Sequence, residues 1–139
     1  MKDLFLISEV EEITGVKVRT LQYWARSDFI IPSKQRAAGS GVHRHYTFRD
    51  VVAIRTAKRL RDSGVSLQTC RQLQGLLEGL GLDRPLASTY LVVGEDDDIY
   101  LQEGEKLISL LKNPGQFTGG FILDIQDVVN EVKEAVWAA

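Results

Sequence analysis

A glycine followed by a short two-faced helix, from Gly15 to Trp24, is the feature that most constrains how this chain can fold. At helical spacing Val18, Leu21 and Ala25 fall on one side, which makes that side apolar. The other side carries side chains that can reach base edges or phosphates: Arg19, Gln22, Tyr23 and Arg26. A solvated surface helix shows the same division, so periodicity alone leaves DNA contact and simple exposure both open.

The residues before this glycine predict another helix. Ser8 and Glu11 have the spacing of a capping box, which predicts a helix from Glu9 to Thr14. Gly15 suits the left-handed residue that commonly follows the end of a helix. Two short helices joined by a tight turn are therefore expected.

The second helix is predicted over residues 18–27, and Lys17 occupies the position where a Ser, Thr, Asp or Asn cap is preferred. A phosphate bound there would satisfy the free amides and pair with Lys17, whereas an exposed, poorly capped end is the alternative. From the geometry of this helix, Lys17 and Thr20 join the candidate DNA contacts.

A β-hairpin is predicted after the short extended apolar piece Phe29–Pro32. Two arms within residues 33–46 flank a Gly39-Ser40-Gly41 tip. The arms carry the basic or titratable residues Lys34, Arg36, His43, Arg44 and His45. Two histidines two residues apart could share a metal, but no further ligand stands closer than Asp50, so a basic wing on DNA is the favoured interpretation.

The charge is divided unevenly along the 139 residues. Residues 1–79 contain 13 Lys and Arg against 8 Asp and Glu, whereas residues 80–139 contain 4 against 11. Within residues 17–61 the balance is 11 against 2. Because salt screens charges beyond about 10 Å, this local excess matters more to a phosphate backbone than the overall net charge of −2.

Two further helices are predicted in the basic half. Thr47 caps the first, with Asp50 in its first turn, and its buried stripe consists of Val51, Ile54, Ala57 and Leu60. Gly64 ends this helix and Ser66 caps the next. Cys70 falls in register with leucines, so we interpret it as a core residue rather than a reactive thiol.

The acidic half is predicted to be a small α/β module. The glycines and proline between positions 75 and 85 place a linker at residues 80–87, between a domain at 1–79 and a module at 88–139. Strands over 88–93 and 99–102, a helix over 105–112, a strand over 117–123 and a helix over 124–137 give the order ββαβα. The acidic run 94–98 lacks the ligand spacing of a calcium loop, so a solvated turn is favoured. Such a small module is expected to bury one face against a second copy or against the first domain.

Composition excludes several classes of protein. No apolar run approaches the roughly 20 residues that span a bilayer, and the N-terminal residues do not form a secretory signal, so no membrane partner and a cytoplasmic location are expected. One cysteine rules out an internal disulfide or a cysteine zinc cluster. No nucleophile lies near either histidine in sequence and no phosphate-binding glycine loop precedes a helix, so we predict neither an enzyme nor a cofactor.

Several ordered motifs resemble the MerR family of bacterial transcription regulators. Leu6 to Trp24 is similar to its helix-turn-helix, and Phe29–Pro32 to the strand that leaves the recognition helix. Arg44-His45-Tyr46 is similar to the wing segment, and residues 60–67 to a conserved helix turn. The resemblance covers residues 4–77.

This resemblance implies a mainly α, winged helix-turn-helix that binds double-stranded DNA as a homodimer. Carried over by position, Arg19 and Tyr23 are implied contacts of the recognition helix, and Arg44 and Tyr46 of the wing region. Gln22 stands where the family usually has arginine, which suggests a changed base preference. Trp24 replaces a tyrosine and is interpreted as packing.

The family's long dimerising coiled coil is absent from the predicted pattern, so the C-terminal module is expected to form the dimer or to bind a protein partner. The region also lacks the cysteines of metal-sensing members, which argues against metal sensing. We predict a sequence-specific transcription regulator. The alternatives are an antitoxin-like or adaptor protein that holds a partner through the acidic module, and an excisionase-like architectural DNA binder.

Overall fold

A computed structural model of the chain describes residues 3–38, 41–79, 91–93, 99–103, 106–109, 121–123 and 125–138. Side chains are described outside residues 35–44, 73, 76, 77, 79, 91–126 and 138. Among the described residues, no helix combines the length and apolar character that crossing a bilayer requires.

The N-terminal half begins with a strand and two short helices. Strand β1 (Leu4–Phe5) leads into α1 (Ile7–Thr14), and α2 (Val18–Arg26) follows after Gly15. Gly15 has φ +79° and its N–H donates to the Glu11 carbonyl at 2.8 Å, which confirms it as the left-handed residue that ends α1.

The start of α1 differs from the prediction. The helix begins at Ile7, so Ser8 lies inside its first turn and cannot act as the cap. The Glu9 carboxylate instead accepts from the Leu6 N–H at 2.9 Å, and this bond secures the chain that enters the helix. The predicted capping box of Ser8 and Glu11 is therefore wrong, and Glu11 is used elsewhere.

A β-hairpin follows, as predicted, but it begins later than the apolar segment. Phe29 and Ile30 form a bend and are 2% and 1% exposed, so these residues are anchors in the core and no strand is assigned to them. Strand β2 (Lys34–Ala38) pairs antiparallel with β3 (Gly41–Thr47), and β1 adds to the other edge of β3 in the order β1-β3-β2. The predicted tip at residues 39–40 lies outside the described residues.

Helix α3 (Phe48–Asp62) is the centre of the molecule. Its capping box is confirmed: the Asp50 N–H donates to Thr47 Oγ1 at 3.2 Å, and the Thr47 N–H donates to Asp50 Oδ2 at 2.9 Å. The predicted stripe is buried, but so are Val52 and Ala53. Four consecutive buried residues, 51–54, mean that neighbours cover this part of the helix on all sides.

Helix α4 (Leu67–Gly79) follows α3 after Gly64, which has φ +98°. Ser66 Oγ accepts from the Thr69 N–H at 3.1 Å, so the predicted cap is confirmed. Cys70 is completely buried and belongs to the core, as expected from its register.

The acidic half contains one four-stranded antiparallel sheet. Its strands β4 (Leu91–Val93), β5 (Ile99–Glu103), β6 (Lys106–Ser109) and β7 (Phe121–Leu123) lie in the order β6-β5-β4-β7. The helix predicted over 105–112 is wrong in its described part, because Lys106–Ser109 pairs with β5 as a strand. The acidic run 94–98 and the linker 80–87 lie outside the described residues.

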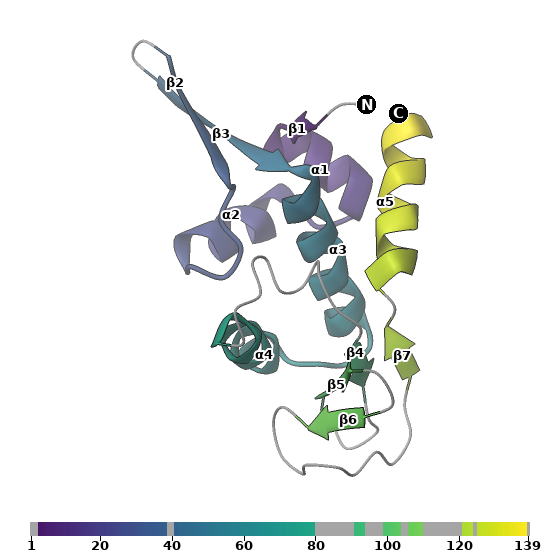
Figure 1. Cartoon of the computed structure of the whole chain (residues 1–139). Coiled ribbons are helices and arrows are strands. Elements are labelled where there is room, and N and C mark those ends of the chain that lie inside the picture. The colour runs from purple at the N-terminus through teal and green to yellow at the C-terminus, as the bar shows by residue number, and fades with distance from the viewer. Residues whose placement is uncertain are drawn as a thin grey trace.

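The last helix, α5 (Ile125–Ala138), packs beside α1 and α3 on the side away from α2 (Figure 1). Val128 and Val132 are 0% and 1% exposed and join the same core cluster as the residues of α3. The expectation that the C-terminal segment buries a face against the first domain is thus met by α5. The core of the helix-turn-helix includes residues from both ends of the described chain.

Candidate nucleic-acid interface

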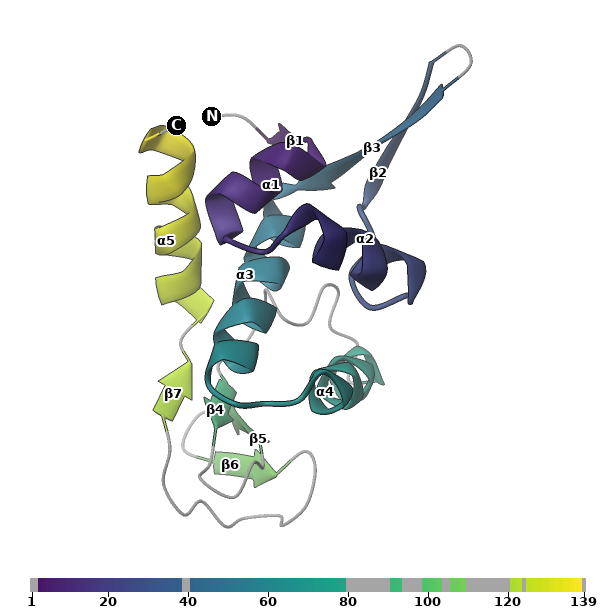
Figure 2. The same ribbon diagram turned by 180° about the vertical axis from the view of Figure 1, so that it is seen from behind.

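Helix α2 and the β2–β3 hairpin lie on the same side of the molecule, and the hairpin extends well beyond the helical body. Seen from behind, α3 separates this side from α5 (Figure 2). The arrangement gives one short helix and one projecting hairpin, which are the two elements that the sequence assigned to DNA.

One face of α2 is anchored in the core. Leu21 is 1% exposed and Trp24 is 5% exposed, and the Trp24 ring meets Phe29 edge-on with centroids 5.2 Å apart. Trp24 is thus a packing residue, as predicted. Ala25 and Val18 are only half-buried, so the apolar side is narrower than the sequence pattern suggested.

The opposite face of α2 is open to solvent. Tyr23 is 49% exposed and Thr20 is half-buried. The exposed side chains of this face and of the residue before the helix are those of Lys17, Arg19, Gln22, Tyr23 and Arg26. Positions 19, 22, 23 and 26 follow each other at helical spacing, so four polar side chains project from one side of an otherwise anchored helix.

Both ends of α2 are held by side chains from other helices. At the N-terminal end, Glu11 of α1 accepts from the Val18 N–H through Oε2 at 2.7 Å. At the C-terminal end, Arg71 of α4 donates to the Ser27 carbonyl at 2.8 Å and lies over the Phe29 ring, 5.4 Å from its centroid. Gln74 donates to the Phe29 carbonyl at 2.7 Å.

These supporting residues were missed in the sequence. Nothing in the spacing of Arg71 or Gln74 points to a helix more than 40 positions earlier. For Glu11 the sequence did hold one indication. The Lys17 side chain has no hydrogen-bond acceptor, so the N-terminus of α2 needs an acceptor from another residue. Both alternatives for this terminus, a bound phosphate and an exposed, poorly capped end, left the first amide of α2 unassigned, and in the structure this amide has a carboxylate partner.

The hairpin brings its predicted residues into register. Lys34 pairs with His45, Gln35 with Arg44 and Arg36 with His43 along the β2–β3 ladder. Lys34 is exposed and His45 half-buried, whereas the side chains of Arg36, His43 and Arg44 lie outside the described residues. Among the described residues, no group of three or more His, Cys, Asp or Glu is placed to hold a metal.

Tyr46 does not lie on the surface as the resemblance implied. It is 2% exposed and is one of the largest fully buried side chains. Its strand neighbour in the sheet is Phe5 of β1, which is 1% exposed. Tyr46 therefore fixes the base of the hairpin to the core, and we remove it from the candidate DNA contacts.

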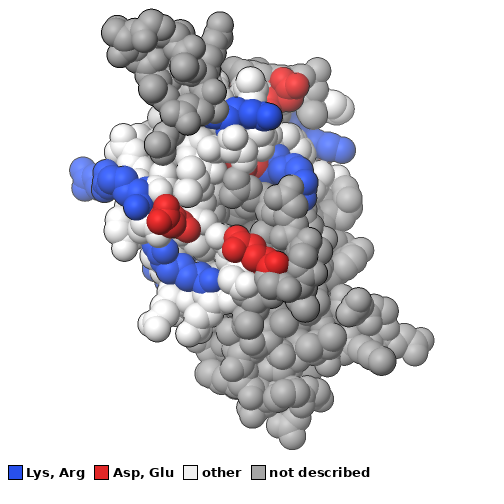
Figure 3. Space-filling model, turned by 60° about the vertical axis from the view of Figure 1, so that its left-hand side comes forward, with Lys and Arg blue, Asp and Glu red and all other residues white. Residues whose placement is uncertain are grey.

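The charge on this side is mixed. When the side of α2 and the hairpin is turned forward, Lys and Arg groups are spread over the described surface, with Asp and Glu groups between them (Figure 3). The part of this surface that the structure describes is not a continuous basic patch. Contacts to phosphate would therefore depend on particular cations, such as Lys17 before α2 and Lys34 at the start of the hairpin.

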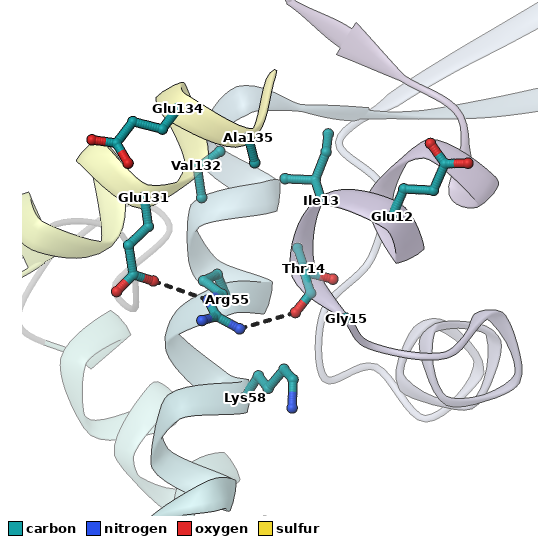
Figure 4. Close-up of a pocket in the computed structure, with 10 residues that line it drawn as sticks. All are labelled: Glu12, Ile13, Thr14, Gly15, Arg55, Lys58, Glu131, Val132, Glu134 and Ala135. Atoms are coloured by element: carbon teal, nitrogen blue, oxygen red, sulfur yellow. Dashed lines mark hydrogen bonds and ion pairs between the residues drawn. The ribbon is translucent and has the colours of Figure 1, made fainter. Parts of the chain in front are cut away.

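A second feature lies on the side of the molecule away from α2, where α5 packs against α1 and α3. A groove of 590 Å³ runs along this seam (Figure 4). At its centre, Arg55 donates from Nε to Glu131 Oε2 at 3.0 Å and from Nη1 to the Thr14 carbonyl at 3.1 Å. Arg59 forms a further ion pair with Glu131. One guanidinium thus joins α5 to the residue that precedes the Gly15 turn.

A turn between two short helices, a solvent-facing second helix and an adjoining hairpin define a winged helix-turn-helix. Residues 5–76, just over half of the chain, match the family described as MerR HTH family regulatory protein. The chain belongs to that family.

Named relatives agree with this assignment. An uncharacterized HTH-type transcriptional regulator of Mycobacterium tuberculosis is 45% identical over 60 residues, which are 43% of this chain and 27% of the relative. The HTH-type transcriptional repressor CarH of Myxococcus xanthus is 34% identical over 77 residues, or 55% of this chain and 25% of the relative. The HTH-type transcriptional regulator HmrR of Rhizobium leguminosarum is 33% identical over 72 residues, or 52% and 53%. The match therefore spans between a quarter and about half of each relative.

Proposed function

We propose that this protein is a sequence-specific DNA-binding regulator of transcription that places α2 in the major groove and the β2–β3 hairpin on the flanking backbone. The observation that carries the proposal is the recognition face of α2. Arg19, Gln22 and Tyr23 are exposed on a helix whose opposite face and both termini are fixed by the core. Membership of the MerR family and the names of the relatives support it.

Each proposed contact follows from the chemistry of its side chain. Arg19 can donate two hydrogen bonds to a guanine edge, and Gln22 can pair with adenine. Lys17, Thr20, Tyr23 and Arg26 suit phosphates or sugars, and the hairpin residues Arg36, His43, Arg44 and His45 are assigned to the backbone beside the groove. Gln22 is the position that we expect to set this protein's own base preference.

We also propose that two copies act together. A helix of nine residues is about 13 Å long, so it covers about four base pairs, which is too few for a specific site. A dimer would present two such helices to half-sites one helical turn apart. We assign the pairing surface to the parts of residues 88–139 that do not pack against α1 and α3; whether this segment also binds a protein partner stays a prediction. The relatives named above are regulators or repressors, and none is named as an antitoxin or excisionase.

The test is a mobility-shift titration with a duplex from the region upstream of the protein's own gene, with a scrambled duplex beside it. Arg19→Ala is expected to weaken specific binding by about 10- to 100-fold, as loss of a bidentate base contact does. Lys133→Ala is the matched control: it removes one cation from α5, the helix on the far side of α3. It is expected to change both affinities by less than about twofold.

Lys17→Ala separates phosphate contact from base contact. It is expected to weaken binding to both duplexes equally and to lower the slope of log K against log salt by about 1. If Arg19→Ala and Arg44→Ala both left specific binding unchanged, the assignment of α2 and the hairpin would be wrong. A light-scattering mass of one chain at binding concentrations would contradict the dimer.

A further inference from the structure

The N-terminus of α2 needs an acceptor that its own sequence does not supply. Lys17 is the N-cap residue, with φ −64° and ψ 145°, and its side chain makes no capping hydrogen bond. The first internal bond of the helix runs from the Leu21 N–H to the Lys17 carbonyl at 2.9 Å. The amides of the first turn, which come before Leu21, therefore need acceptors from outside the helix.

Glu11 supplies one of them from the preceding helix. Its Oε2 lies 2.7 Å from the Val18 nitrogen, a distance typical of a charge-assisted hydrogen bond. The contact is partly buried and joins residues seven positions apart, across the Gly15 turn. The carboxylate also faces the positive end of the helix dipole, where a negative charge is favourable.

We propose that Glu11 is a positioning residue for DNA recognition: it caps the recognition helix from α1 and so sets the angle between the two helices. The proposal rests on the proposed function of α2. Glu11 contacts the backbone of Val18, the residue directly before Arg19, so any movement of the first turn of α2 displaces the principal base-reading side chain. At the C-terminal end of α2, Arg71 donates to the Ser27 carbonyl. The first turn is therefore the part of α2 whose position depends on Glu11.

Because of where Glu11 lies, its removal is expected to have opposite effects on specific and on sequence-independent DNA binding. A carboxylate next to the start of the recognition helix repels DNA phosphates, so its removal strengthens sequence-independent binding. The same removal leaves the Val18 amide without its acceptor and loosens the geometry of Arg19, so specific binding weakens. A residue that served only as a surface charge would shift both affinities in the same direction.

The test compares affinities of the full chain for a specific duplex and a scrambled duplex at one salt concentration. Glu11→Ala is expected to reduce the ratio of specific to non-specific affinity by about fivefold, the effect of losing one helix cap. Glu11→Gln retains an acceptor oxygen and is expected to keep the ratio within about twofold. Glu12→Ala is the matched control, since it removes an equal charge from the neighbouring exposed position of α1.

A rescue variant keeps the test decisive if Glu11→Ala is poorly folded. Lys17→Ser places a hydroxyl at the N-cap position, where it can accept from the Arg19 or Thr20 N–H of the same first turn, and in the Glu11→Ala background it is expected to restore part of the affinity ratio. It also removes a cation, so both absolute affinities are expected to fall. An affinity ratio unchanged in Glu11→Ala, or unrestored by Lys17→Ser, would overturn the proposal.

The Val18 amide gives a readout that does not involve DNA. In a ¹H–¹⁵N spectrum its proton signal is expected to move upfield in Glu11→Ala and to stay in place in Glu12→Ala. If the wild-type protein binds no duplex specifically, the proposed function fails while this signal still decides whether Glu11 caps α2. An identical Val18 shift in both variants would overturn the capping role itself.

Discussion

Replacing Val132 by alanine tests whether the C-terminal helix is part of the core of the helix-turn-helix. Val132 lies on α5, is 1% exposed and belongs to the core cluster that includes α3. The change removes two methyl groups, worth about 0.8 kcal/mol each in transfer free energy, and it leaves a small cavity. We therefore expect the free energy of unfolding to fall by about 2 to 3 kcal/mol. For a chain of this size the melting temperature should fall by about 6 to 10 °C.

The assay uses the two tryptophans of the chain. In a Trp137→Phe background, Trp24 becomes the only tryptophan; it is 5% exposed and lies on α2, across the core from α5. Urea unfolding followed by the fluorescence of Trp24 therefore monitors the helix-turn-helix, where this tryptophan lies. Glu134→Ala, at an exposed position of α5, is the control and should leave the transition unchanged. If Val132→Ala shifted the Trp24 transition by less than about 0.5 kcal/mol, the reasoning would be refuted, because surface substitutions have effects of that size.

Two further substitutions test the local geometry by urea unfolding. Gly15→Ala is expected to cost about 1 to 2 kcal/mol, because Gly15 has φ +79° and alanine adopts that conformation only with strain; an unchanged midpoint would mean that the turn can rearrange. Asp50→Ala is expected to cost about 2 to 4 kcal/mol, because it removes the acceptor for the Ser33 N–H, the Ser33 hydroxyl and the Thr47 N–H. Asp50→Asn keeps one acceptor oxygen and should cost less, and the reverse order would contradict this account.

The elements that could be predicted from sequence are those fixed by neighbouring residues. Thr47 and Asp50 cap each other three positions apart, and Gly15 ends α1 through its own backbone conformation. Such signals act within one turn of helix, so they do not depend on the rest of the fold. The exposed face of α2 was predictable for the same reason, since its buried partners Leu21 and Trp24 lie within the same helix.

The errors arose where distant residues decide the structure. The segment 105–112 was predicted to be helical, but its described part, Lys106–Ser109, forms a strand, because β5 offers a ladder that local preference does not anticipate. The family resemblance implied a DNA contact for Tyr46, yet the packing of the sheet base buries it. Glu11 was assigned to its own helix, whereas its acceptor role lies across the turn. In each case a contact with residues elsewhere in the chain decides the structure.

The position of α5 also has a consequence for the order in which the parts of this protein fold during synthesis. Domains generally fold as they leave the ribosome, N-terminal part first. Here α2 (Val18–Arg26) is made before Val128 and Val132, which complete the core around α3. A ribosome that stalls in the acidic half would therefore hold a chain in which α2 is present but the core around α3 still lacks α5. Folding of the helix-turn-helix is in this sense tied to the synthesis of α5.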